Sequence, residues 1–148
     1  MTLKLSQNVT IKCDYNLRKR YKPMNKVIHT DKAPAAVGPY SQAILAGNTL
    51  YVSGQIPLNP ETGAIEATDI TGQAHQSLTN IKNILEAAGF SLNDVVKTTC
   101  LLADVNDFAA FNAVYAEYFS ENKPARACFG GNDIPKGALV EVEVIAVK

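Results

Sequence analysis

Two charged side chains near the end of the chain are the strongest candidates for chemistry. Arg126 follows Pro124 in a short run typical of a strand, and Glu141 lies in segment 139–144, where apolar and acidic residues alternate. Such alternation predicts a strand with one buried and one polar face. If the two strands pair, a guanidinium and a carboxylate share one polar face. That pair can bind a small carboxylic acid and hold a water molecule beside it.

A structural ion pair is the more common use of an arginine and a glutamate on one sheet face, so both interpretations of Arg126 and Glu141 stay open on these residues alone. Glu143 shares the predicted face of Glu141, but a spacing of roughly 6.5–7 Å along a strand weakens their coupling. Cys128 shares the face of Arg126. Because no histidine lies near it in the sequence, packing is favoured over a nucleophilic role.

Four further positions are candidates for lining a site. Ser53 and Gly54 follow a predicted strand. The serine lacks the Gly-x-Ser-x-Gly setting of a serine hydrolase, whereas the glycine permits a ligand to approach the backbone closely. Asn112 alone is typical of an exposed polar position in a helix. Tyr40 alone is typical of a tyrosine that packs against its neighbours.

The elements that must position these side chains follow the order β-β-β-α-β-α-β-β. A Gly-Asn pair at 47–48 predicts a hairpin, and a long apolar stripe predicts a helix that Thr68 or Asp69 caps and Gly89 ends. We expect Asn106 to cap the second helix. Its predicted buried stripe is Phe108, Phe111, Val114, Tyr115, Tyr118 and Phe119. The predicted strands are 26–29, 40–46, 49–53, 95–102, the run around Arg126 and the run around Glu141.

Two amphipathic helices on one face of a mixed sheet make an α+β, two-layer fold. The other sheet face then stays uncovered. It carries Tyr51, Ser53, Glu141 and Glu143 if the alternation holds, and it must meet solvent, a ligand or another copy of the chain.

Composition narrows the classes of function. The chain has 148 residues and 47% hydrophobic residues, which predicts one globular domain. Fourteen basic and fourteen acidic residues cancel, so no electrostatic footprint indicates nucleic acid. No apolar run approaches a membrane span. Two histidines without a Cys/His cluster argue against a metal site, and three cysteines without paired spacing indicate a reducing, intracellular setting.

Residues 1–23 differ from the rest, with six basic residues against one acid. They lack the apolar core of a secretory signal. A variable extension before a domain over residues 24–148 is the main interpretation, and a mitochondrial presequence is the alternative. An added edge strand from Thr10 to Tyr15 is expected if part of this segment docks.

Four separated segments together resemble the signatures of the RidA family, also called YjgF or L-PSP, the reactive intermediate/imine deaminases. They are 33–42, 52–57, 124–128 and 134–143, and the similarity runs from about residue 24 to residue 148. The resemblance implies a chorismate-mutase-like fold and a homotrimer with active sites between subunits. It also implies hydrolysis of 2-imino acids such as 2-iminobutanoate and 2-iminopropanoate to 2-oxo acids and ammonia, without a cofactor.

By position, the resemblance implies that Arg126 binds the substrate carboxylate and that Glu141 positions and activates water. It further implies a pocket lined by Tyr40, Ser53, Gly54, Asn112 and the backbone of Cys128. Segment 129–133 departs from the apolar run expected there, which bears on the shape of the pocket wall and hence on the substrate.

Two other functions remain as alternatives. Some relatives are described as endoribonucleases or translation inhibitors, against which the balanced charge and the lack of a histidine pair argue. A non-enzymatic small-molecule-binding or chaperone-like module is the third. We expect a cytoplasmic location, with a mitochondrial one as the alternative, small carboxylic acids as ligands, and neither nucleic acid nor membrane as partner.

Overall fold

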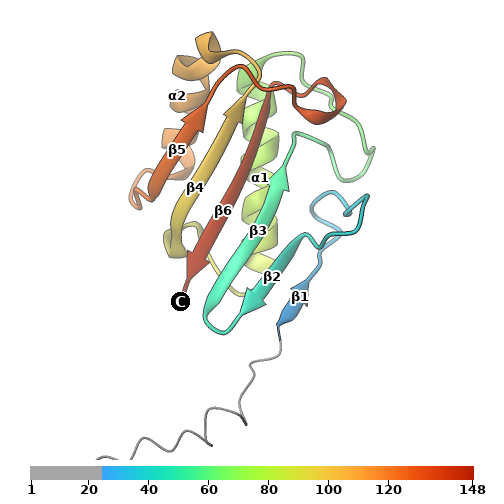
Figure 1. The fold of residues 1–148 in the computed structure, drawn as a ribbon, viewed down its shortest axis with the longest axis vertical. Coiled ribbons are helices and arrows are strands. Elements are labelled where there is room, and N and C mark those ends of the chain that lie inside the picture. Colours follow the sequence, from blue (N-terminus) through green and yellow to red (C-terminus); the bar gives the residue numbers. More distant parts are fainter. Residues whose placement is uncertain (1–24) are drawn as a thin grey trace, which may run out of the picture.

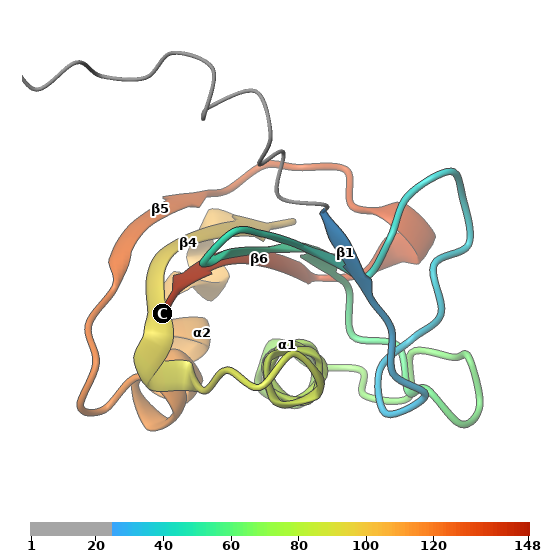
Figure 2. The same ribbon diagram turned by 90° about the horizontal axis from the view of Figure 1, so that it is seen from below.

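The computed structural model describes residues 25–148, which form a six-stranded mixed sheet with two helices on one of its faces (Figures 1 and 2). The predicted α+β, two-layer architecture and the predicted order of elements are confirmed. The elements are β1 Lys26–Ile28, β2 Ala43–Ala46, β3 Thr49–Gln55, α1 Ile70–Ala87, β4 Val95–Leu102, α2 Phe108–Tyr118, β5 Ala125–Phe129 and β6 Val140–Val147.

The sheet order is β1-β2-β3-β6-β4-β5, so the last strand in sequence lies in the middle of the sheet. β6 runs antiparallel to both β3 and β4, and β5 runs parallel to β4 at the sheet edge. Figure 1 shows β6 between its two neighbours, and Figure 2 shows the sheet curving over the helices. β5 and β6 therefore do not pair with each other, because β4 separates them.

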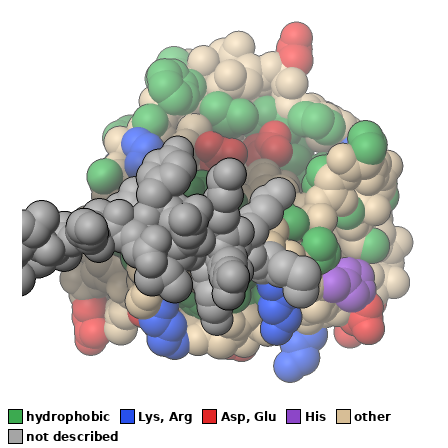
Figure 3. Space-filling model, turned by 60° about the horizontal axis from the view of Figure 1, so that its bottom comes forward, with side chains coloured by type: hydrophobic (Ala, Val, Ile, Leu, Met, Phe, Trp, Pro, Cys, Tyr) green, Lys and Arg blue, Asp and Glu red, His purple; other side chains and the backbone are tan. Residues whose placement is uncertain are grey.

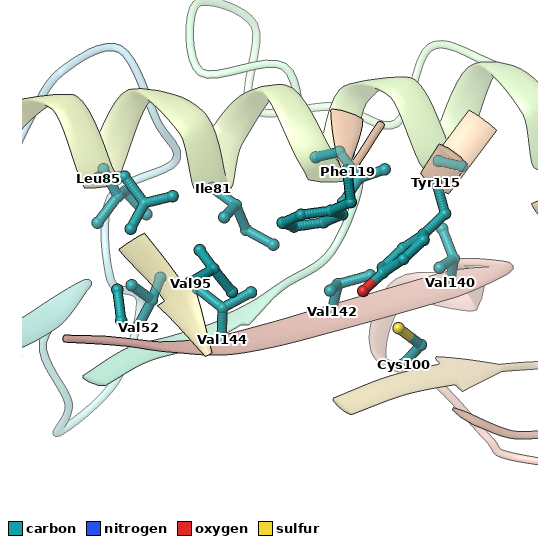
Figure 4. Close-up of a cluster of buried hydrophobic side chains, with 14 of the residues drawn as sticks. Val52, Ile81, Leu85, Val95, Cys100, Tyr115, Phe119, Val140, Val142 and Val144 are labelled. Atoms are coloured by element: carbon teal, nitrogen blue, oxygen red, sulfur yellow. The ribbon is translucent and has the colours of Figure 1, made fainter. Parts of the chain in front are cut away.

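The core lies between the helices and the sheet. β6 contributes Val140, Val142 and Val144, which alternate with the acidic residues and are buried. Figure 4 shows apolar side chains of the helix layer pointing at these valines. Each such side chain contributes about 1.5–3 kcal/mol of hydrophobic stabilisation when fully buried. The predicted stripe of α1 is buried at Ile70, Ala74, Leu78, Ile81, Ile84 and Leu85.

The predicted ends of α1 are confirmed. The Asp69 side chain accepts a hydrogen bond from the Gly72 amide at 2.8 Å, which satisfies one free donor of the first turn. Gly89 follows the helix with a φ of +79°, a conformation that favours glycine.

β2 begins at Ala43, not at Tyr40 as predicted, because the preceding segment is organised by a side chain instead of a strand ladder. Gln42 is 2% exposed. Its oxygen accepts from the Thr30 amide at 2.7 Å, and its nitrogen donates to the carbonyl oxygens of Thr30, Ala33 and Pro34 at 2.9–3.1 Å. The buried side-chain amide of Gln42 thus provides hydrogen bonds that a neighbouring strand would otherwise supply, and it holds the loop that carries Tyr40.

α2 begins differently from the prediction. A 3₁₀ turn over Val105–Asp107 precedes it, and Asp104, not Asn106, caps that turn by accepting from the Asn106 amide at 2.8 Å. Phe111 and Tyr115 of the predicted stripe are buried, but Phe108 is 41% exposed. As the first residue of α2, Phe108 lies at the rim of the interface between this helix and the sheet.

The edge strand predicted from Thr10 to Tyr15 lies outside the described residues. Among residues 25–148, no helix has the length and apolar character needed to cross a membrane.

Candidate functional site

Arg126 lies on the helix-facing side of β5. It is level with Thr98 of β4, which is fully buried and hydrogen-bonded to Tyr115 of α2. Because side chains level with each other on paired strands share a face, the arginine side chain also extends toward α2. This position is the edge of the sheet, since β5 has a neighbour on one side only.

One face of α2 holds the Arg126 guanidinium. Asn112 Oδ1 accepts a hydrogen bond from Arg126 Nη1 at 2.8 Å. The Arg126 Cζ atom lies 4.5 Å from the ring centre of Tyr115 and 5.5 Å from that of Phe108. Phe108, Asn112 and Tyr115 stand at spacings i, i+4 and i+7, which places them on one side of a helix. A single helical face therefore provides a polar contact and two aromatic contacts for one cation.

The arginine has free hydrogen-bonding capacity. Within residues 25–148, no carboxylate forms an ion pair with Arg126. A surface hollow of about 490 Å³ lies beside it, lined by Asn112, Tyr115, Ala116, Phe119, Lys123, Pro124 and Arg126. A planar guanidinium with unused donors at a hollow is suited to bidentate binding of a carboxylate.

Glu141 lies on the opposite, uncovered face of the sheet. It alternates with the buried Val140 and Val142, and it lines a hollow of about 170 Å³ with Gly54, Thr99, Leu101 and Glu143. Partial burial, and secondarily the neighbouring Glu143, raises the pKa of Glu141. A carboxylate with a raised pKa is a stronger base, so this residue is suited to accepting a proton from water.

A β-bulge in β3 brings Gly54 against Glu141. Val52 pairs with Val144 and Gln55 with Val142, so three steps along β3 match two along β6. Val52 and Gln55 are both buried, which leaves Ser53 and Gly54 together in the irregular stretch between them. A Cβ at Gly54 would overlap the Glu141 carboxylate group. β3 was predicted to end at Ser53; the bulge instead continues the strand through Gln55.

Ser53 connects this strand to the loop before β2. Its hydroxyl donates to the Ser41 carbonyl oxygen at 2.6 Å, and its amide donates to the Gln42 carbonyl oxygen at 3.0 Å. Tyr40 lies in that loop, half exposed, and its hydroxyl oxygen accepts from the Val37 amide at 3.5 Å. Neither Ser53 nor Tyr40 lines the two hollows described above.

The expectation that Arg126 and Glu141 share one sheet face is wrong. Arg126 is level with Thr98 and, across β4, with Val144 on the helix side, whereas Glu141 is level with Leu101 on the open side. The two Cα atoms are also about 10 Å apart across the strands and about 10 Å apart along them, from standard strand spacings. The sequence identified the residues, but the pairing of their strands through β4 was not readable from it.

The predicted site residues therefore form two groups in one chain. The open-face group contains Glu141 and Gly54, with Ser53 adjacent to them. The edge group contains Arg126 and Asn112. Cys128 lies two residues beyond Arg126, level with Cys100, and packs partly against the core.

Both of these thiols are poor nucleophiles in this setting. Burial raises the pKa of the Cys100 thiol to about 12, with the nearby Cys128 as the second cause. Burial also raises the pKa of Cys128, and the Arg126 charge opposes that effect. Both thiols stay protonated at neutral pH, which agrees with packing as the favoured role of Cys128.

Segment 129–133, which departs from the resemblance, turns tightly after β5. Gly130 lies so close to Val105 that a Cβ there would overlap the valine. The Asn132 side chain donates to the carbonyl oxygens of Leu102 and Phe129, each at 3.0 Å. Phe129 is exposed and level with Leu101 on the open face. Segment 129–133 is thus a turn held by side-chain hydrogen bonds, with an exposed aromatic side chain at its start.

Sequence reasoning missed several residues of these two groups. Tyr115 and Phe108 were assigned to the core stripe, although the spacing of Phe108, Asn112 and Tyr115 was a readable signal for one helical face. Thr99 and Leu101 carry no signal of their own, because only the register of β4 with β6 places them beside Glu141. Among the described residues, no group of three His, Cys, Asp or Glu side chains is placed to hold a metal ion.

Figure 3 shows one side of the molecule, on which acidic and hydrophobic side chains lie next to one another. The α+β sheet thus has an uncovered face with a partly buried glutamate, and an edge arginine that pairs with no carboxylate among residues 25–148, an arrangement suited to binding small ligands. The sequence matches the profile of the family described as Endoribonuclease L-PSP over residues 30–148. The chain belongs to this family, which confirms the resemblance stated above.

Known relatives cover most of this chain. A RutC family protein of Pyrococcus horikoshii is 58% identical over 84% of this chain and 99% of that protein. A 2-iminobutanoate/2-iminopropanoate deaminase of Capra hircus is 50% identical over 84% of this chain and 91% of that protein. The solved structure of Escherichia coli TdcF with bound serine is 44% identical, covers 83% of this chain and 98% of that chain, and has a TM-score of 0.80.

Proposed function

We propose that this protein hydrolyses small 2-imino acids, including 2-iminobutanoate and 2-iminopropanoate, to 2-oxo acids and ammonia. The observation that carries the proposal is the Arg126 guanidinium, which Asn112 and two aromatic rings hold while no carboxylate within residues 25–148 pairs with it. Such an arginine is a carboxylate receptor that is organised before the ligand arrives. Relatives about 50% identical to this chain are named deaminases of this kind.

We further propose that the active site lies between copies of the chain in a homotrimer. The edge group of one copy would face the open-face group of the next, so that Arg126 and Glu141 meet across the interface. Two features support this arrangement. The residues lie on opposite faces within one chain, and the uncovered face carries exposed Tyr51 and Val147 beside the half-buried Ile145.

In the proposed reaction, Arg126 binds the substrate carboxylate through two hydrogen bonds and thereby places the imine carbon near Glu141. The Glu141 carboxylate accepts a proton from a water molecule as the water oxygen attacks that carbon. Glu141 then returns this proton to the nitrogen of the carbinolamine. The C–N bond breaks as the hydroxyl group loses its proton to Glu141, and ammonia and a 2-oxo acid leave. A protonated imine is already electrophilic, so orientation and a single base are sufficient.

The first experiment measures the decay of 2-iminobutanoate generated in place by an amino-acid-oxidising or dehydrating enzyme. We expect the parent protein to accelerate the decay, Arg126→Ala to raise KM strongly, and Glu141→Gln to lower kcat by about 10²–10⁴-fold. A parent without any acceleration would refute the deaminase. Binding of 2-oxobutanoate without turnover would instead favour the small-molecule-binding module.

Mixed assemblies test the position of the site. At a substrate concentration well below the raised KM of Arg126→Ala, we expect Arg126→Ala and Glu141→Gln each to show little activity alone. When the two variants are unfolded and refolded together in equal amounts, about a quarter of the interfaces combine an intact arginine with an intact glutamate if assembly is random and heterologous. We expect about a quarter of the parental activity to return. A mixture as inactive as its components would contradict a site shared between copies.

The family description favours RNA cleavage as a second candidate. Within the described residues, His29 contacts Asp31, and His75 contacts Tyr118 and Glu117, so both histidines pair with residues outside the two site groups. Nuclease activity that co-purifies with the protein and disappears in Arg126→Ala would support this candidate. Activity that stays constant across the site variants would exclude it.

A further inference from the structure

Tyr115 is the nearer of the two aromatic rings that contact the Arg126 guanidinium, and it is itself held by several neighbours. The ring centre lies 4.5 Å from the Arg126 Cζ atom, closer than the second aromatic ring. The tyrosine is 8% exposed, and its ring also packs against Phe111 and Phe119 at centroid distances of 5.8 and 4.6 Å. Figure 4 shows Tyr115 extending from the helix layer toward the sheet.

The far end of the ring is tied to the sheet. The Tyr115 hydroxyl and the Thr98 hydroxyl lie 2.9 Å apart, and Thr98 is fully buried on β4. Thr98 is also the residue level with Arg126 across the β4–β5 pair. The threonine, the tyrosine and the arginine thus form a closed connection: the strand neighbour of Arg126 fixes the ring on which the Arg126 side chain rests.

We infer that Tyr115 is a positioning residue for the carboxylate-binding arginine, and that Thr98 fixes Tyr115 in turn. This inference rests on the proposed function, because it concerns how the receptor for the substrate carboxylate is held. A bidentate contact requires the guanidinium plane to match the carboxylate plane. A ring face against the guanidinium sets that plane before the substrate binds, whereas Asn112 supplies one in-plane hydrogen bond.

Three variants separate positioning from folding. Tyr115→Leu removes the ring, and we expect KM for 2-iminobutanoate and the Kd for 2-oxobutanoate to rise about two- to thirtyfold, the range of a partly desolvated cation–π contact. Tyr115→Phe keeps the ring but leaves the buried Thr98 hydroxyl without this partner. We expect Tyr115→Phe to lower thermal stability and to raise KM less than Tyr115→Leu does, because the ring stays but is no longer fixed by Thr98. Thr98→Val breaks the same hydrogen bond and should match Tyr115→Phe in KM.

Tyr118→Leu is the matched control. This tyrosine lies on the same helix, but its hydroxyl bonds to Thr79 and to the His75 carbonyl oxygen, away from the arginine. We expect its KM to equal that of the parent. A purely structural role of Tyr115 would instead lower stability and active-protein yield in both Tyr115 variants and leave KM unchanged, which would overturn the inference.

A measurement without substrate completes the test. The chain contains three arginines, so the Nε–H resonance of Arg126 can be assigned with Arg126→Lys. We expect its heteronuclear NOE to fall in Tyr115→Leu and to fall less in Tyr115→Phe. If the parent shows no imine hydrolysis, the proposed function fails whatever the NOE. If the parent is active but neither KM nor the NOE responds to Tyr115→Leu, the positioning role fails and the proposed function stands.

Discussion

At the scale of single residues, the environment of Glu141 costs stability while it strengthens the base that the proposed reaction uses. Burial is the first cause that raises its pKa, and Glu143 is the second. The folded chain therefore binds the Glu141 proton more tightly than the unfolded chain does. The stabilising contribution of this proton is complete below the pKa of an unfolded glutamate and is lost as the pH rises through the folded pKa. Above that value, the ionised Glu141 destabilises the fold.

Glu141→Gln tests both sides of this balance. We expect imine hydrolysis to fall, and we expect the midpoint of thermal unfolding to rise relative to the parent at about pH 7.5, because a neutral amide avoids the buried charge. The difference should vanish near pH 4, where the parental carboxyl group is protonated. Thermal unfolding of the parent and of Glu141→Gln at the same chain concentration measures the difference between their midpoints at each pH. A Gln variant less stable than the parent at neutral pH would contradict the expected sign.

Glu143→Gln is the control for this prediction. It removes only the second cause of the raised pKa, so the acid side of the activity profile should move to lower pH while the maximal rate is retained. A profile that does not move would mean that burial alone sets the pKa of Glu141.

At the scale of elements, a buried glutamine replaces a strand in the segment that precedes β2. The Gln42 side chain makes four hydrogen bonds to backbone groups of residues 30–34. These backbone groups are not part of a strand pair, so their hydrogen bonds depend on Gln42. Because Ser41 and Gln42 in turn accept hydrogen bonds from Ser53, the loop and the bulged strand beside Glu141 are coupled.

Gln42→Ala is expected to destabilise the protein by roughly 2–4 kcal/mol, since it leaves buried backbone groups without partners and opens a small cavity. Gln76→Ala is a matched control, because Gln76 donates only to Asn80 on the same helix. We expect that variant to lose less than about 1 kcal/mol. Urea unfolding measures both. Equal losses in the two variants would refute the special role of Gln42.

Elements with a strong local pattern were predictable, and those that depend on partners were not. The Asp69 cap, the Gly89 end of α1 and the alternation around Glu141 follow from local geometry and were confirmed. The insertion of β6 between β3 and β4 was not foreseen, because pairing between distant segments has no local signal. That insertion decides which face each site residue occupies. The bulge at Ser53 and Gly54 was missed because glycine was taken as the end of the strand.

At the scale of the whole molecule, one sheet face is covered by helices and the other is not. The middle of the uncovered face holds a row that runs from Ile44 through Tyr51 to Ile145. Tyr51 is 50% exposed in the single chain. An exposed apolar row on an uncovered sheet face favours association with other copies, and the proposed active site requires such association.

Ile145→Glu is expected to prevent formation of the proposed homotrimer. A charge in the middle of the apolar row would have to be buried without a partner, which opposes association of the copies. We expect a monomer by light scattering and an almost complete loss of imine hydrolysis, because the edge group and the open-face group no longer meet. Thr71→Glu, on the exposed first turn of α1, is the control and should leave mass and activity unchanged. A trimeric, active Ile145→Glu variant would refute the assigned interface.

The central place of β6 also has a consequence for biosynthesis. The ribosome produces β3 and β4 before β6, yet both strands need β6 as their neighbour. Until β6 emerges, each nascent chain has two unpaired strand edges, which invite pairing with other nascent chains. Completion of the sheet thus depends on the last of its described strands to be synthesised. Any delay in the synthesis of residues 140–147 should therefore lengthen the time during which these two edges can pair with other chains.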